Sequence, residues 1–392
     1  MTIYRFSAQA LTPIHIGCGT EIDPTSFVLK DKALIQFNPS QVIGELSEED
    51  RIRFVSVSER SNIKEIQTFL RSKVDDRRHA LLRLDTSEAF RREFESKGAN
   101  PGNQFRVEMM PRTTNGATVY LPGSSIKGSI RTAVINHFTN HLEASKTEVH
   151  NSVNAAIPNK KWVALEESAL NRQIKETEKD LFRLIGVGDV LLPNGATRID
   201  RVVNHNPKKE GSEKIQMWFE RLKSFADDQT PPDFNVDITI DDKAMAHPKV
   251  KSLLGRTLGI QSIMRACNQF YWGRMQAEGE KFDGLKAGSS FWKAIHGCFP
   301  KGRLNGEILT IDPSQPFWNN SEYNMHYVLL RVGRFSHFES LSVDELRQGY
   351  NIQAKRPIIG MGATRIRCAM ENGKPLMPFG WMILKLQETV GK

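Results

Sequence analysis

Two hydrophobic periods alternate along this chain. In residues 3–10 the side chains of Tyr4, Phe6 and Ala8 fall on one side, with mostly polar residues between them. That alternation is typical of a half-buried β-strand. Between Ile126 and Phe138 apolar residues instead recur every four positions, which predicts the buried stripe of a helix. The pattern therefore predicts a fold of the α+β class.

The same criteria place further elements along the chain. Short strands are predicted at 27–29, 33–37, 105–109, 118–121, 236–240, 325–332 and 382–386. Helical segments are predicted from about 58 to 97, from about 162 onward and from about 248 to 281. Asn115-Gly116 lies between two predicted strands and is a strong hairpin signal. A longer hairpin spans residues 198–219, and its polar tip carries Lys208 and Lys209; the alternative for that tip is an ordinary surface loop.

Residues 120–131 carry the clearest candidate chemistry. A Pro-Gly pair ends a strand there, and Ser124 or Ser125 is a suitable N-cap for the following helix. Lys127 and Arg131 are four residues apart and therefore lie on one helix face. Free backbone N–H groups, hydroxyls and cations gathered at one point suit a phosphate. The simpler alternative is a capped core helix with exposed basic residues. The stretch is not a Walker A loop, because no Ser or Thr directly follows Lys127.

Composition narrows the class of protein. The chain has 392 residues, with 54 Lys and Arg against 45 Asp and Glu, for a net charge of +9. This excess favours a polyanionic partner, most simply nucleic acid. Four scattered cysteines without a CxxC pair support neither a disulfide framework nor a zinc site. With no membrane-length apolar run and no signal peptide, the sequence predicts a cytoplasmic protein that needs no cofactor and no membrane.

Two loops carry further candidate groups. His15 follows the first strand and precedes Gly17 and Gly19; a histidine in such a loop is more often structural than catalytic. Near the C-terminus, Gly360 and Gly362 precede a strand with Arg365 and Arg367, and we interpret this segment as a contact to an RNA backbone. No Gly-x-Gly pair has the third glycine and following helix of a dinucleotide site.

Three motifs in both halves of the chain resemble the signatures of RAMP proteins in CRISPR effector complexes. They are residues 12–19, 121–131 and 360–365. The length of the chain and residues 331–340 and 378–381 resemble the family of fifth Csm subunits of type III-A systems. The order of elements, a strand, helix, hairpin and strand repeated twice, is also that of RRM-like split βαβ domains.

The resemblance implies two ferredoxin-like (RRM-like) RAMP domains, at 1–243 and 244–392, with helical insertions and a thumb hairpin. It further implies a non-catalytic subunit that binds crRNA, caps its 3′ end in the Csm interference complex and supports crRNA maturation and assembly. The expected partners are the crRNA, the adjacent backbone RAMP subunit and the small helical subunit, with target RNA and host nucleases as further candidates. The residues predicted to contact RNA are His15, Gly17, Gly19, Ser124, Ser125, Lys127, Arg131, Lys208, Lys209, Arg334, His337, Gly360, Gly362, Arg365 and Arg367.

A RAMP endoribonuclease is the competing hypothesis. In the sister RAMP subunit an aspartate in the loop after the first strand cuts target RNA, and Asp23 lies in the comparable loop of this chain. His15 is the alternative acid–base group. The residues around Asp23 depart from the sister's pattern, and no carboxylates have metal-ligand spacing. A third alternative is a basic α+β protein of unrelated role.

Overall fold

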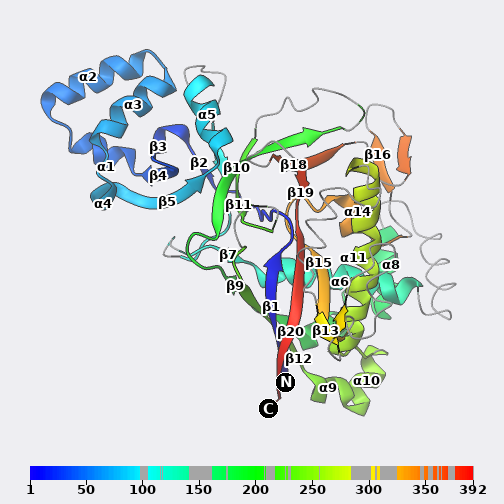
Figure 1. Cartoon of the computed structure of the whole chain (residues 1–392). Helices are drawn as coiled ribbons and strands as arrows, with labels where there is room; N and C mark the ends of the chain where they lie inside the picture. The colour runs from blue at the N-terminus through cyan, green and yellow to red at the C-terminus, as the bar shows by residue number, and fades with distance from the viewer. Residues whose placement is uncertain are drawn as a thin grey trace.

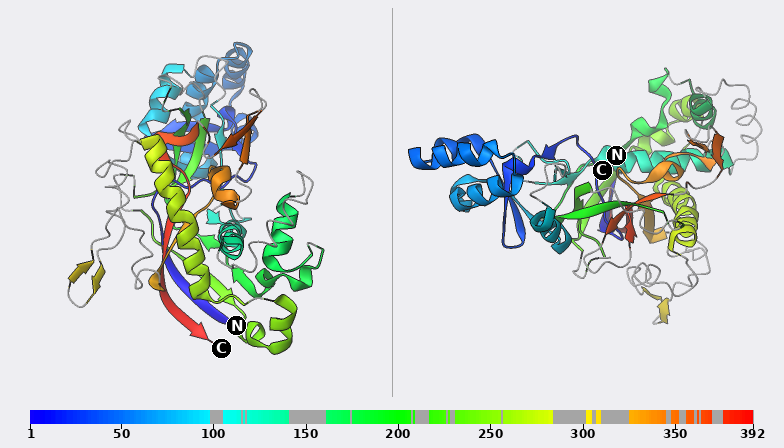
Figure 2. Two further views of the ribbon diagram at one scale, coloured as in Figure 1. Left: turned by 90° about the vertical axis from the view of Figure 1, so that its right-hand side faces the viewer. Right: turned by 90° about the horizontal axis from the view of Figure 1, so that it is seen from above.

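The computed structural model shows a body built on a long twisted sheet, from which a lobe of helices and strands projects (Figures 1 and 2). The structure describes residues 1–97, 105–114, 116, 118–140, 161–173, 175–206, 208, 217–225, 227, 231–255, 257–283, 302–304, 307–309, 325–344, 348–351, 356–359, 362, 364–369 and 376–391. None of the helices within these ranges is long and apolar enough to cross a membrane.

The body is organised around a five-stranded antiparallel sheet. Its strands, in spatial order, are β15 (Tyr327–Arg331), β20 (Trp381–Gly391), β1 (Thr2–Ala10), β12 (Phe234–Ile240) and β8 (Ile185–Val187). Helix α6 (Gly123–Asn140) connects β1 toward β8, and α11 (Ile260–Asp283) connects β12 toward β15. This is the split βαβ arrangement of a ferredoxin-like domain.

Strands from the two ends of the chain lie side by side in this sheet. Thr2 pairs with Gly391, so both termini lie at the same end of the sheet (Figure 1). The predicted alternation in β1 is confirmed, because Phe6, Ala8 and Ala10 are buried. Strands from both sides of the predicted boundary at residue 243 belong to this one sheet. β1 and β12 precede the boundary, and β15 and β20 follow it.

A second sheet of nine strands carries the lobe. Its main path is β2 (Glu21–Ile22), β6 (Val107–Glu108), β11 (Met217–Leu222), β10 (Thr197–His205), β5 (Ala80–Thr86), β4 (Ala33–Phe37) and β3 (Phe27–Lys30), while β18 (Arg365–Ala369) pairs with β10 and with β19 (Leu376–Pro378). The antiparallel pair β10–β11 confirms the predicted long hairpin.

The lobe is an insertion of helices on both faces of β3–β5. Its helices are α1 (Pro39–Gly44), α2 (Glu48–Glu59), α3 (Ile63–Lys73), α4 (Asp76–His79) and α5 (Glu88–Lys97). Phe69 of α3 packs in one core and Phe90 of α5 in another, on opposite faces of the strands. The predicted uninterrupted helical segment at 58–97 is wrong, because β5 interrupts it. Leu82 and Leu84 alternate inward there and pair with β4.

The remaining elements connect these layers. They are η1 (Pro24–Ser26), β7 (Tyr120–Leu121), α8 (Lys161–Leu170), η3 (Thr177–Lys179), η4 (Leu181–Leu184), β9 (Val190–Leu191), α9 (Asp242–Ala246), α10 (Pro248–Leu254), β13 (Gly302–Leu304), β14 (Glu307–Leu309), α14 (His337–Leu341), β16 (Gln348–Asn351) and β17 (Arg356–Ile359). The hairpin predicted around Asn115-Gly116 is present but short: the N–H of Thr113 donates to the carbonyl of Thr118 at 2.9 Å, and the N–H of Tyr120 donates to the carbonyl of Pro111 at 3.1 Å. The longer strand pairings of this region are with other elements. β6 pairs with β2 and β11, β7 pairs with β9, and one bridge joins Arg112 to Val119.

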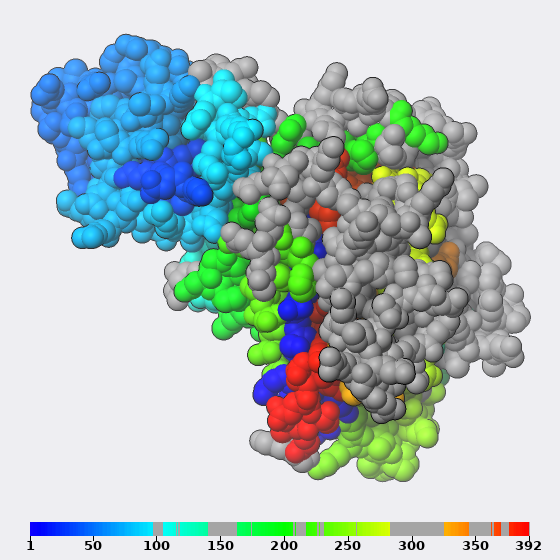
Figure 3. All heavy atoms as spheres, viewed as in Figure 1, coloured from blue at the N-terminus to red at the C-terminus, as the bar shows by residue number. Residues whose placement is uncertain are grey.

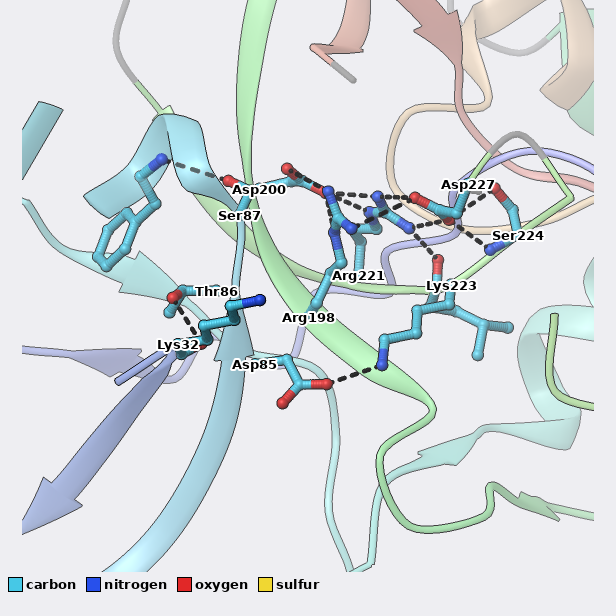
Figure 4. A network of polar contacts seen from close by, with 12 residues as sticks. Lys32, Asp85, Thr86, Ser87, Arg198, Asp200, Arg221, Lys223, Ser224 and Asp227 are labelled. Carbon is cyan, nitrogen blue, oxygen red and sulfur yellow. Dashed lines mark hydrogen bonds and ion pairs between the residues drawn. The ribbon is translucent and has the colours of Figure 1, made fainter. Parts of the chain in front are cut away.

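A buried ion network joins β10, β11 and the segment that follows β11 (Figure 4). Arg221 on β11 donates to Asp200 on β10 at 2.9 Å and to Asp227 at 2.6 Å, and all three side chains are buried. Arg198 donates to Asp200 at 2.7 Å. One step away, β10 pairs in parallel with β5 of the lobe. Because buried charges are costly unless they are paired, this network favours one arrangement of β10, β11 and the segment after β11.

Candidate nucleic-acid interface

Three of the predicted segments converge on the C-terminal end of β15 and the residues that follow it. The loop after β1 reaches it through the carbonyl of His15, which accepts from the N–H of Arg334 at 3.0 Å. Helix α6 reaches it through Ser129, whose hydroxyl donates to the carbonyl of Arg331 at 2.7 Å. Arg365 of β18 binds Glu339, which follows in α14. These contacts, which are mostly buried, bring segments that are far apart in sequence into one region around the end of β15.

His15 is enclosed beneath this region. Its ring is buried between Phe219, at 4.8 Å between ring centroids, and Phe335, at 5.9 Å. Nδ1 lies 2.7 Å from the carbonyl oxygen of Glu220. A carbonyl only accepts, so Nδ1 carries the proton and Nε2 does not. Burial lowers the pKa of His15 to about 4. The ring is therefore a neutral structural group, which does not fit an acid–base catalyst working near neutral pH.

This environment predicts a pH dependence of stability. The pKa of about 4 lies below the ordinary value of 6.5, so the unfolded chain binds the proton more tightly than the folded protein. Stability is then complete above pH 6.5 and falls as the pH drops toward 4, by at most about 1.4 kcal/mol per pH unit. His15→Asn retains a donor for Glu220 but does not titrate. Urea unfolding at pH 7.5 and 4.5 should show a smaller loss for this variant, and an equal loss would contradict the assignment.

Gly17, Gly19 and Arg334 form the exposed part of the loop surface. A side chain on Gly17 would lie 3.4 Å from the Arg334 side chain and 3.7 Å from Nε2 of His15. Gly333 has a φ of +93°, and a Cβ there would come within 2.4 Å of the His15 carbonyl, so only glycine allows this approach. Arg334 forms an ion pair with Glu108 at the surface. The predicted residues His15, Gly17 and Arg334 are thus brought into contact.

The N-terminus of α6 differs from the prediction. The helix begins at Gly123, so Ser124 and Ser125 lie in its first turn and are not its N-cap. The backbone N–H of Gly123 donates to a carboxylate oxygen of Asp189 at 2.7 Å. A Cβ on Gly123 would lie 2.2 Å from the carbonyl of Val187, which explains the glycine. Asp189 therefore occupies the anion position that the sequence suggested for a phosphate.

The two cations of α6 have different environments. Arg131 binds Glu166 at 2.5 Å and Asp180 at 3.0 Å, and both carboxylates also bind Arg172. Arg131 is therefore a structural ion-pair residue, and its predicted role beside Lys127 at one phosphate is not supported. Lys127 is half-buried, and burial lowers its pKa while Asp180 opposes that effect. Ser124 and Gly128 lie beside it on the exposed face.

The arginines of β18 are buried, which corrects the prediction of an exposed pair. Arg365 binds Glu339 at 2.8 Å and approaches Glu278 at 3.5 Å. Arg367 is 4.0 Å from Glu278 and donates to the carbonyl of Leu376 at 2.8 Å. Arg331 also binds Glu278, at 2.8 Å. The alternation of the strand turns both β18 arginines toward this buried pair of glutamates, so they support the interface from inside.

The other predicted residues lie around this scaffold. His337 is partly buried, and burial with the charges of Arg331 and Arg365 lowers its pKa to about 3. The N–H of Gly362 donates to Glu339 at 3.2 Å. Lys208 is exposed on the hairpin. Lys209 and Gly360 fall outside the described residues.

Asp23 has a structural role at the surface. One of its carboxylate oxygens accepts from the backbone N–H of Thr25 at 2.9 Å and from the Thr25 hydroxyl at 2.7 Å, which caps η1. In the described part of the chain, no group of three or more His, Cys, Asp or Glu side chains is placed to hold a metal ion.

Sequence reasoning missed the acidic partners. Glu278 lies in a helix with mixed polarity and Glu339 in a short segment, and neither has a local pattern that marks it as buried. Glu220 was also missed, although it holds Arg112 with two contacts of 2.6 Å and accepts from Thr197 at 2.6 Å. β11 is buried on both faces from Trp218 to Leu222, so alternation along the strand does not distinguish Glu220.

Comparison with known proteins defines the class. The sequence model of the RAMP superfamily matches residues 7–242. The chain therefore belongs to the RAMP superfamily, which confirms the resemblance seen in its motifs.

One curated relative and two solved structures resemble the chain in more detail than the superfamily model does. The protein named CRISPR system Cms protein Csm5 of Methanocaldococcus jannaschii is 25% identical over 216 residues, which is 52% of this chain and 46% of that protein. The chain thus matches about half the length of this curated relative. A chain in the cryo-EM structure of a Csm-crRNA-target RNA ternary complex from a type III-A CRISPR-Cas system has a TM-score of 0.63, with 15% identity, 98% of this chain and 100% of that chain covered. The crystal structure of T. onnurineus Csm5 has a TM-score of 0.59, 15% identity and coverage of 96% and 99%. These likenesses confirm the predicted α+β fold with ferredoxin-like RAMP domains.

Proposed function

We propose that this chain is a non-catalytic RNA-binding subunit of a type III-A Csm complex, placed at the 3′ end of the crRNA. The observation that supports this most is the structural likeness over nearly the whole chain to a protein of a Csm-crRNA-target RNA complex. In this proposal the chain binds crRNA, lies near target RNA, and contacts the adjacent backbone RAMP subunit and the small helical subunit. Host nucleases that trim the crRNA would act beside it.

The described surface supports binding of an RNA backbone through loops. Gly17, Gly19, Ser124 and Gly128 expose main chain or small side chains, and Lys127 and Arg334 supply positive charge beside them. Small residues let a phosphodiester chain approach the protein closely, and contacts to phosphates carry no sequence preference. A subunit that must accept any guide needs this kind of contact.

The nuclease alternative has less support. Asp23 uses one carboxylate oxygen to cap η1, and His15 is enclosed and neutral. A metal-assisted cut needs several oxygen ligands around one cation. We therefore propose a binding role, in which RNA cleavage belongs to other subunits.

Lys127→Ala should lower the slope of log affinity against log salt for single-stranded RNA by about 0.7, the value for one lost phosphate contact. Fluorescence anisotropy over a salt series measures this slope. Asp23→Ala is the control, expected to leave the slope unchanged and the RNA intact with magnesium present. An unchanged slope in Lys127→Ala would remove this residue from the interface, and magnesium-dependent products that vanish in Asp23→Ala would support the nuclease instead.

A further inference from the structure

A pocket of about 180 Å³ lies between β5 of the lobe and the connection from β9 to β10 in the body. Its apolar walls come from Leu82, Leu84, Val119, Leu192, Pro193 and Ala196. Its polar lining comes from Arg83, Asp85, Arg112, Asn194 and Thr197. Figure 3 shows that the lobe stands away from the body, and Figure 4 shows Asp85 and Lys223 facing each other where the two parts meet.

A strand edge borders this pocket. β5 pairs along its length with β4, but it pairs with β10 only at Asp85 and Thr86. Within the described residues, the other edge of β5 at Leu82–Leu84 therefore faces the pocket and has no neighbouring strand. An unpaired strand edge presents backbone N–H donors and C=O acceptors in alternation. Such an edge suits a flat ligand that has both donors and acceptors on its rim.

The charges around the pocket do not suit a phosphate. Arg112 donates to both carboxylate oxygens of Glu220 at 2.6 Å, so its charge is already balanced. Lys223 binds Asp85 at 2.8 Å, and Arg83 lies 3.5 Å from Asp76. The carboxylate of Asp85 is itself 57% exposed at the pocket. An anion would meet cations that already have carboxylate partners, whereas a ligand with an amino group would meet the exposed carboxylate of Asp85 as an acceptor.

We propose that this pocket binds one cytosine-type nucleobase, a pyrimidine with an exocyclic amine. The volume is below the roughly 300–1,000 Å³ of pockets for drug-sized ligands and accommodates one small ring. Leu82, Val119 and Pro193, the lining apolar residues that are not fully buried, contact the faces of the base. Asp85 accepts from the exocyclic amine, the contact by which carboxylates distinguish cytosine. The inference rests on the proposed function only for the source of the base, which is either bound RNA or a free nucleoside.

Methyl NMR of the full chain tests the pocket directly. Cytidine should move the methyl resonances of Leu82, Leu84, Val119 and Leu192 in a saturable way, with uridine binding about tenfold more weakly. Asp85→Asn should remove this preference and weaken cytidine binding about tenfold. Asp237→Asn, which also removes an exposed partner of a basic residue on a strand, is the matched control and should change neither value.

A second experiment distinguishes the two sources of the base, bound RNA and a free nucleoside. Oligouridine with a single cytidine should move the same methyl groups more than oligouridine alone if the base belongs to bound RNA. Movement by cytidine alone assigns the pocket to a free nucleoside. If neither ligand moves these methyl groups, or if Asp85→Asn changes nothing, the proposal is overturned, even where RNA still binds elsewhere on the chain. RNA binding that fails while cytidine still binds would count against the proposed function alone.

Discussion

Replacing Arg221 by methionine is expected to lower the free energy of unfolding by about 3–5 kcal/mol. The guanidinium of Arg221 is buried between Asp200 and Asp227, and methionine fills similar space without a charge. The variant therefore leaves a buried carboxylate, Asp227, without its main partner. Urea unfolding followed by circular dichroism measures the difference.

Arg5→Met is the matched control. Arg5 also bridges two carboxylates, Asp237 at 3.1 Å and Glu388 at 3.4 Å, but its side chain is 44% exposed. Exposed pairs contribute about 0–1 kcal/mol, so this variant should change little. Adding Asp227→Asn to Arg221→Met should recover part of the loss, because it removes the unpaired charge. Equal small losses for Arg221→Met and Arg5→Met would mean that the buried network stabilises the fold no more than an exposed ion pair does.

Gly128→Glu is expected to stabilise the fold and weaken RNA binding at the same time. Gly128 lies in α6, it is exposed, and a Cβ there meets no atom within 4 Å. Removing a glycine from a helix interior stabilises it by about 0.5–1 kcal/mol. The added carboxylate lies beside Lys127 at the proposed interface and repels phosphate, which should weaken RNA binding about tenfold or more at low salt.

Gly273→Glu provides the comparison. Gly273 is exposed on α11, and a Cβ there also meets open space. This variant should gain the same helix stability and leave RNA affinity unchanged. Thermal unfolding and fluorescence anisotropy on both variants separate the two effects. If both variants weaken RNA binding equally, the loss of affinity comes from the change in net charge and not from the place of the added carboxylate on α6.

Local sequence patterns predicted those elements whose burial follows a simple period. The alternation in β1, the four-residue repeat of α6 and the hairpin β10–β11 are all present. β5 was missed because the charged segments before and after it have helical patterns. Its pairing with β4 is what distinguishes this segment as a strand. The sharing of sheets by the two halves also depends on pairing between distant strands, such as β1 with β20.

The candidate site was predicted by residue type but not by exposure. Glycines and basic residues at the loops identified the segments that meet at β15. Sequence could not tell that Arg365, Arg367 and Arg131 face internal carboxylates while Lys127 and Arg334 are at least partly accessible. Each partner is remote in the chain, as with Arg365 and Glu278, so no local pattern records the pairing.

We propose that this subunit holds the 3′ end of the crRNA, and cross-linking to the RNA shows whether it does. Ultraviolet cross-linking of the assembled complex, purification of this subunit and sequencing of the attached RNA locate the nucleotides it contacts. We expect cross-links concentrated near the 3′ end of the crRNA, with fewer in complexes that carry Gly128→Glu. Cross-links confined to the 5′ end of the crRNA, or none above background, would contradict it.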